Sequence, residues 1–147
     1  MREKLAKTLE ELEEEAGRFA GSLAPQAGGA TLVTLAGELG AGKTAFTKAA
    51  ARALGVDEVL TSPTFVLEKI YQLRGSTPKF KRLVHIDAYR LESGKELVTL
   101  GFDELMRDSS NLIFLEWPEK VADALPAPAT QISLEAFPDG SRVITYG

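Results

Sequence analysis

The feature that most constrains this chain is a glycine-rich loop that stands between a buried strand and a helix. Residues 37–44 read Gly-Glu-Leu-Gly-Ala-Gly-Lys-Thr and match the pattern G-x-x-x-x-G-K-[ST]. The preceding run, residues 31–35, is apolar and β-branched, which is typical of a buried strand. After the loop, apolar residues recur at helical spacing: Phe46, Ala49, Ala50 and Ala53. The order strand, loop, helix is the context in which this pattern binds phosphate.

Each residue type in the loop suits an anion such as a nucleotide phosphate. The glycines let the backbone curl around one anion, and the new helix adds unpaired N–H groups and its positive dipole end. Lys43 supplies a cation for the β and γ phosphates, and the Thr44 hydroxyl can ligate Mg²⁺. The predicted nucleotide-binding residues are Gly37, Glu38, Leu39, Gly40, Ala41, Gly42, Lys43 and Thr44. Guanine-specific proteins usually need an Asn-Lys-x-Asp segment; the sole asparagine, Asn111, precedes leucine, so ATP is the favoured nucleotide.

Two carboxylates follow predicted strands and are candidates for the chemistry. Asp87 follows the run 83–86, and Glu116 follows the apolar run 112–115. Ligands of open α/β sheets bind where strands end, and phosphoryl transfer depends on positioning and charge neutralisation. We therefore predict Asp87 and Glu116 as catalytic residues, whereas a purely structural role would be to cap turns. The residues alone leave open which of the two is a base and which is a Mg²⁺ ligand.

Other polar and aromatic residues have both a functional and a structural interpretation. The hydroxyl-rich stretch 61–64 is either a switch that senses a γ-phosphate or an ordinary turn. His85 fits a hydrogen-bonding structural histidine better than a catalytic base, because no second His or Cys accompanies it. Trp117 either stacks on a ligand or partner or packs in the core. The basic stretch 69–82 is either a solvated hairpin or a surface for an acidic partner or RNA.

Helices and strands alternate along the rest of the chain. An apolar stripe predicts a helix over residues 5–23, whose acidic face, including Glu15, is expected to be solvated. The other predicted elements are strands at 64–71, 80–87 and 112–115, helices at 94–100 and 118–125, and a hairpin of 130–137 with 141–146. We therefore predict an α/β fold in one P-loop domain over residues 1–147. Its central mixed sheet is largely parallel, with flanking helices and a C-terminal antiparallel hairpin.

Composition narrows the function classes further. The chain lacks cysteine and has one histidine, which excludes disulfides, thiolate chemistry and a multi-histidine metal centre. Lys and Arg total 17 against 21 Asp and Glu, a net charge of −4, whereas dedicated nucleic-acid binders are basic. No apolar run approaches the ~20 residues of a membrane span. Without a signal-peptide pattern either, we expect a cytoplasmic protein with no membrane partner.

Four sequence blocks, taken together, resemble the TsaE (YjeE) family of bacterial P-loop ATPases. They are residues 37–44, Ser62-Pro-Thr-Phe65, His85-Ile-Asp-Ala-Tyr-Arg-Leu91 and Glu116-Trp-Pro118. The resemblance spans nearly the whole chain and implies one α/β domain that binds ATP and Mg²⁺. It implies these roles: phosphate binding by Lys43, metal binding by Thr44 and Glu116, hydrolysis through Asp87, and a place near the nucleotide for Trp117. It also implies switch-like roles for Ser62, Pro63, Thr64, Phe65, His85, Tyr89 and Arg90.

The same resemblance implies a setting in tRNA modification. The family works with the TsaD–TsaB heterodimer, which makes threonylcarbamoyladenosine next to the anticodon of tRNAs reading codons that start with A. ATP hydrolysis is then expected to reset that complex, and tRNA to be contacted indirectly through it. Two other functions stay open, a non-hydrolysing nucleotide-dependent assembly module and a small-molecule kinase. Many members place a threonine of the first helix near the nucleotide; Leu12 aligns best with it, and Thr8 is the alternative.

Overall fold

Strands and helices alternate in the computed structural model, which describes residues 2–56, 68–74 and 79–147. The strands are β1 (Arg2–Ala6), β2 (Thr31–Ala36), β3 (Glu68–Gln72), β4 (Arg82–Asp87), β5 (Asn111–Glu116), β6 (Thr130–Ala136) and β7 (Arg142–Tyr146). The helices are α1 (Leu9–Ser22), α2 (Lys43–Ala53), α3 (Gly94–Thr99) and α4 (Phe102–Met106), with 3-10 turns η1 (Pro118–Lys120) and η2 (Ala122–Ala124). Over these described ranges, no helix is both long and apolar enough to cross a membrane.

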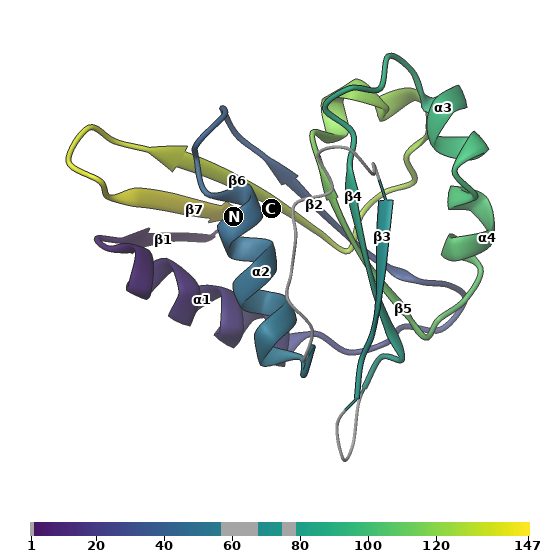
Figure 1. Ribbon diagram of the computed structural model, residues 1–147, viewed down its shortest axis with the longest axis horizontal. Helices are drawn as coiled ribbons and strands as arrows, with labels where there is room; N and C mark the ends of the chain where they lie inside the picture. The colour runs from purple at the N-terminus through teal and green to yellow at the C-terminus, as the bar shows by residue number, and fades with distance from the viewer. Residues whose placement is uncertain (1, 57–67, 75–78) are drawn as a thin grey trace.

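The described strands form one seven-stranded mixed sheet in the order β1-β7-β6-β2-β5-β4-β3 (Figure 1). In its centre, β2 pairs in parallel with β5 and β6, and β4 pairs in parallel with β5. Antiparallel pairs stand at the edges, with β3 on β4 at one side and the β6–β7 hairpin beside β1 at the other. The predicted α/β class, with its largely parallel core and C-terminal hairpin, is confirmed.

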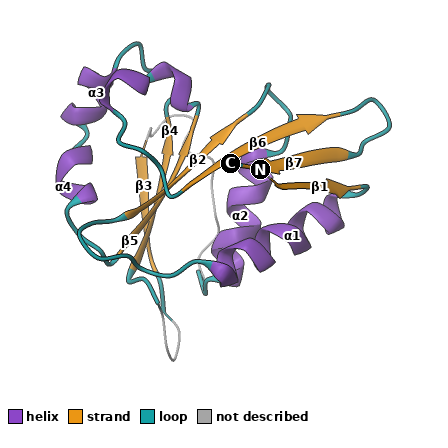
Figure 2. Ribbon diagram, turned by 180° about the vertical axis from the view of Figure 1, so that it is seen from behind, coloured by secondary structure: helices purple, strands orange, loops and turns teal. Residues whose placement is uncertain are grey.

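Separate apolar clusters cover the two faces of the sheet. Helices α1 and α2 pack together below the wing of β1, β7 and β6 (Figures 1 and 2). Helices α3 and α4 cover the opposite face of the central strands, where Leu97 and Phe102 join the cluster of β2, β4 and β5. Alternate residues of β5 join different clusters, Phe114 on the α1–α2 side and Ile113 and Leu115 on the other. A strand buried on both faces is typical of a parallel sheet. Glu116 is the last residue of this buried strand and therefore lies at the carboxyl end of the central sheet.

The N-terminus departs from the predicted helix over residues 5–23. Its first part is strand β1, because these residues pair in antiparallel register along β7. Thr8 then caps α1, accepting a backbone N–H of the first turn at its Oγ1. Leu5 and Leu9 fitted the apolar stripe but are 58% and 51% exposed. Strand pairing at the sheet edge thus outweighs the helical periodicity.

Glu15 is an exception to the predicted solvated acidic face. Its side chain is buried, accepts a 2.5 Å hydrogen bond from the Tyr146 hydroxyl and pairs with Arg18. Burial, and then this hydrogen bond, raises the pKa of the Tyr146 hydroxyl well above its ordinary value. Glu15 therefore ties α1 to β7 instead of facing water.

Three other segments differ from the predictions. Residues 118–125 form two 3-10 turns instead of one helix, because buried Val121 between them leaves the helical region with φ −130°. Helix α4 was not predicted; Gly101, with φ +83°, follows α3 and serves as the N-cap of α4. The predicted strand at 80–87 begins only at Arg82. The strand predicted at 64–71 is described from Glu68 onward.

Candidate functional site

Glycine conformations shape the loop between β2 and α2. Gly42, the N-cap of α2, has φ +108°, and Gly40 has φ +82°, both in the left-handed region that favours glycine. A Cβ on Gly42 would lie 3.0 Å from Leu12 Cδ2 and 3.1 Å from Arg142 Nε. The positive φ therefore favours glycine at this position, and a Cβ would crowd both of these side chains. The first N–H groups of α2, which have no partner within the helix, start directly after it.

Helix α1 and strand β7 support this loop from behind. Leu12 is fully buried and packs against Gly42, so the best-aligned position for a nucleotide-contacting threonine holds an apolar support instead. Thr8, the alternative, caps α1. Arg142 of β7 donates from Nε to the Ala41 carbonyl oxygen at 3.1 Å. Sequence reasoning missed Arg142, because one arginine in a distant hairpin carries no local pattern.

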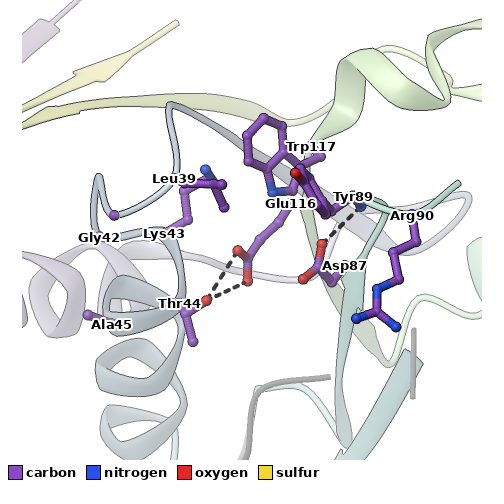
Figure 3. Close-up of a pocket in the computed structure, with 11 residues that line it drawn as sticks. Leu39, Gly42, Lys43, Thr44, Ala45, Asp87, Tyr89, Arg90, Glu116 and Trp117 are labelled. Atoms are coloured by element: carbon purple, nitrogen blue, oxygen red, sulfur yellow. Dashed lines mark hydrogen bonds between the residues drawn. The ribbon is translucent and has the colours of Figure 1, made fainter. Parts of the chain in front are cut away.

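A cavity of about 380 Å³ lies in front of the loop (Figure 3). Its lining consists of Leu39, Gly40, Gly42, Lys43, Thr44, Ala45, Asp87, Tyr89, Arg90, Glu116 and Trp117. All of these except Ala45 are predicted site residues. Strand register explains why the carboxylates meet, since Asp87 stands opposite Glu116 in the parallel β4–β5 pair. Both strands end at the edge where β2 turns into the loop, as expected for ligand sites in such sheets.

The remaining predicted site residues lie elsewhere. Gly37 and Glu38 border a separate hollow, shared with β6 and β7, and Ala41 is buried. His85 contacts Glu116 from behind the cavity and is not part of its described lining. The switch-like residues Ser62, Pro63, Thr64 and Phe65 lie outside the described residues, so their predicted role stays a prediction.

Lys43 brings a poorly solvated cation to the cavity, where only 5% of the residue is exposed. Its Nζ donates to the carbonyl oxygens of Gly37 and, at 3.1 Å, Glu38, and lies 3.9 Å from the centroid of the Trp117 ring. Burial lowers the pKa of the Lys43 amine, and nearby carboxylates, led by Glu116, oppose that shift. A phosphate group would give this cation the anionic partner that buried charges require.

Thr44 and Glu116 bring hard oxygen ligands together at the start of α2. Thr44 Oγ1 lies 3.3 Å from Glu116 Oε1 and 3.4 Å from Oε2 (Figure 3). Mg²⁺ in nucleotide sites takes one or two protein ligands together with phosphate oxygens and waters, so the donor pair fits this ion. Among the described residues, no group of three or more His, Cys, Asp or Glu could hold a metal alone. Phosphate oxygens and waters would therefore complete the coordination.

Asp87 is the second carboxylate of the cavity. Its Oδ1 accepts the backbone N–H of Tyr89 at 3.0 Å. Burial raises the pKa of the Asp87 carboxyl; the Tyr89 N–H opposes this shift, and the charge of Glu116 adds to it. A carboxylate with a raised pKa is a better proton acceptor near neutral pH. Such a shift in a cavity is also typical of functional sites.

Trp117 directly follows β5 and flanks Lys43. Among the described non-glycine residues it alone has a positive φ, with φ +61° and ψ +53°. Its indole lies against the ring of Tyr89, with centroids 4.9 Å apart. Strained backbone of this kind persists where surrounding structure fixes it, often at functional sites. Trp117 lines the cavity and also packs against the apolar cluster that contains Ile113 and Leu115, so its predicted ligand role stays a prediction.

Two residues in the second described part of the basic stretch 69–82 make contacts within the protein. Arg82 forms an ion pair with Asp108 at 2.5 Å. Lys79 Nζ donates to the carbonyl oxygen of Gly21 at 3.0 Å. These contacts favour a structural interpretation of the two residues over a surface for RNA.

Comparisons with known proteins indicate one family for this chain. A family model described as "Threonylcarbamoyl adenosine biosynthesis protein TsaE" matches residues 7–144. A relative from Treponema pallidum (strain Nichols) is 40% identical over 115 residues, covering 78% of this chain and 80% of the relative. A Bacillus subtilis (strain 168) relative is 38% identical over 115 residues, covering 78% and 68%. Both are named tRNA threonylcarbamoyladenosine biosynthesis protein TsaE.

A solved structure shows the same fold. The crystal structure of Bacillus subtilis YdiB superposes with a TM-score of 0.76 at 28% identity, covering 99% of this chain and 83% of that one. The family model covers the loop, both strand-end carboxylates and Trp117, and the two relatives each cover 78% of the chain. The chain therefore belongs to the TsaE family of threonylcarbamoyladenosine biosynthesis proteins.

Proposed function

We propose that this chain is a Mg²⁺-dependent ATPase that acts on the TsaD–TsaB heterodimer during threonylcarbamoylation of tRNA. The observation that carries the ATPase proposal is the meeting of Thr44 and Glu116 beside Lys43, at the start of α2. A helix start, a cation and hard oxygen ligands in one cavity are the parts that phosphoryl transfer needs. Membership in the TsaE family supports the pathway.

The binding roles follow from the lining of the cavity. The loop N–H groups and Lys43 bind the β and γ phosphates, where the positive end of α2 favours negative charge. Thr44 and Glu116 would hold Mg²⁺, which neutralises charge that develops on the phosphates. Trp117 keeps Lys43 against the loop carbonyls by its ring face.

We assign proton transfer to Asp87 instead of Glu116. Glu116 is 2% exposed and its oxygens are near Thr44 and His85, whereas Asp87 is half-buried and lines the cavity. In this step the oxygen of a water bonds to the γ phosphorus, and the bond from that phosphorus to the bridging oxygen of ADP breaks. Asp87 accepts the proton that the attacking water loses, and the products are ADP and inorganic phosphate.

The partner proposal rests on family membership together with charge. TsaE-named relatives are biosynthesis proteins of tRNA threonylcarbamoyladenosine. With a net charge of −4, this chain is poorly suited to bind the phosphates of tRNA directly. We infer that it meets tRNA through TsaD–TsaB and that hydrolysis resets this complex between turnovers.

Phosphate release from Mg·ATP, measured with and without the cognate TsaD–TsaB complex, tests the proposal. We expect slow release alone and strong stimulation by the partner. Lys43→Ala should weaken ATP binding, whereas Lys48→Ala, on α2 but outside the described cavity lining, should behave as the parent. ATP that binds without being hydrolysed in either condition would instead support a nucleotide-dependent assembly module. A phosphorylated small-molecule acceptor would support a kinase.

A further inference from the structure

His85 is a buried histidine that touches the site without facing the cavity. It stands in β4, is 3% exposed, and its Nε2 lies 2.5 Å from Glu116 Oε2. A carboxylate oxygen only accepts hydrogen bonds, so Nε2 is the nitrogen that carries the proton. Because the acceptor is ionisable and the pair is excluded from water, this is a charge-assisted bond of the stronger kind. The Glu116 carboxylate is thus in contact with both His85 and Thr44.

We propose that His85 is a positioning residue that fixes the Glu116 carboxylate in the orientation needed to hold the metal with Thr44. The inference rests on the proposed Mg²⁺-dependent function and adds the group that orients its carboxylate ligand. His85 acts through Glu116, because the described cavity lining does not include it.

Strand register explains how Glu116 meets this partner. In the parallel β4–β5 pair, Asp87 stands directly opposite Glu116, while His85 stands two positions earlier on β4. His85 and Asp87 lie on the same face of the sheet, because side chains alternate along a strand. The Glu116 carboxylate is bonded to His85, which lies on the same face, and it also lies beside Thr44.

Burial makes this orientation energetically significant. A buried carboxylate that lacks hydrogen-bond partners is costly, so Glu116 would turn towards other donors if the His85 donor were removed. Outer partners that orient metal ligands typically contribute 10-fold to 100-fold in metal affinity. We therefore expect loss of the His85 donor to weaken metal binding by about 10-fold to 100-fold. Nucleotide contacts made by the loop and Lys43 should be preserved.

Mn²⁺ binding to the ADP complex, followed by electron paramagnetic resonance, tests the proposal without relying on activity. His85→Gln places an amide N–H near the position of Nε2, whereas His85→Asn places it near Nδ1, too short to reach Glu116. We expect Mn²⁺ affinity close to the parent for His85→Gln and about 10-fold to 100-fold weaker for His85→Asn. ADP affinity in EDTA should be equal for the parent and both variants. Equal Mn²⁺ affinity in the two variants would overturn the proposal.

A double-mutant cycle with Glu116 makes the test specific. In a Glu116→Ala background, His85→Asn should cause no further loss of Mn²⁺ affinity, because its effect passes through the missing carboxylate. An equal loss in both backgrounds would overturn the positioning role and indicate a general disturbance of β4. If the parent itself shows no linkage between Mn²⁺ and ADP, the proposed function fails. If the parent shows the linkage and the variants match it, only the positioning role fails.

Discussion

Trp117 occupies a backbone conformation that favours glycine. We therefore predict that Trp117→Gly is more stable than Trp117→Ala, the reverse of the usual order. With φ +61° and ψ +53°, a residue that has a Cβ is strained by roughly 1–2 kcal/mol. Glycine avoids this strain but costs about 0.5–1 kcal/mol in conformational entropy relative to alanine. Trp117→Ala and Trp117→Gly both lose the indole, so their difference isolates the backbone. Trp117→Gly should be the more stable by about 0.5–1 kcal/mol.

Urea unfolding at 25 °C without nucleotide measures this difference. For a chain of this length, about 1 kcal/mol corresponds to roughly 4 °C in Tm. Glu14 provides the matched control, since it is an exposed residue inside α1 with ordinary helical backbone. There the order should invert, with Glu14→Gly less stable than Glu14→Ala by about 1 kcal/mol. Both Trp117 variants should lose ATP affinity to the same extent, because both remove the ring beside Lys43.

A Trp117→Ala variant as stable as Trp117→Gly would refute the reasoning. It would mean that the turn after β5 relaxes to a negative φ once the indole is gone. The strain would then belong to the aromatic contacts and not to the path of the backbone.

Three further predictions follow from burial and packing. Asp87→Asn should lower the hydrolysis rate by at least ~10² in a phosphate-release assay while retaining ATP affinity. Burial raises the pKa of the Asp87 carboxyl, so its ionised form destabilises the folded state. In urea titrations, Asp87→Asn should therefore be more stable than the parent at pH 7. This difference should disappear below about pH 4, where the carboxyl is protonated in both the folded and the unfolded state. Gly94→Ala should cost about 1–3 kcal/mol in the free energy of unfolding, because its Cβ would lie 2.3 Å from the Ala124 Cβ; intact stability would mean that η2 yields. The pKa of Tyr146 is raised by burial and by Glu15, so the unfolded chain loses this proton above about pH 10 while the folded chain keeps it. Above about pH 10, the free energy of unfolding should therefore fall with pH more steeply in the parent than in Tyr146→Phe, by about 1.4 kcal/mol per pH unit. Parallel plots of unfolding free energy against pH for the two proteins would contradict this.

Local patterns predicted the centre of the fold and most of the cavity lining, whereas Tyr89 and Arg90 were predicted only from the resemblance to the family. The loop, its flanking strand and helix, and the strand-end carboxylates depend on neighbours in sequence. The position of Asp87 opposite Glu116 follows from parallel pairing of the two strands. Strand ends and glycines are features that one sequence displays directly.

Tertiary contacts decided what the sequence could not predict. Leu5 matched a helical stripe, but pairing with β7 placed it in a strand. Glu15 looked like part of a solvated face, and only the approach of Tyr146 gives it a buried partner. The supporting role of Arg142 depends on a hairpin distant in sequence, and the bond between His85 and Glu116 joins neighbouring strands. The spacing of residues along the chain does not predict such pairs, because the two partners are distant in sequence and meet only in the folded protein.

The contact from Arg142 to the Ala41 carbonyl has a consequence for the outer wing of the sheet. It connects β7, and through strand pairing β1, to the loop that is proposed to hold phosphate. Two regions joined in this way share free energy, and thermodynamic linkage makes the coupling equal in both directions. A ligand that stabilises the loop should therefore also stabilise the pairing of β7 with β1, and displacement of these strands should destabilise the loop. A change in the position of β7 would therefore be transmitted to the loop through this hydrogen bond.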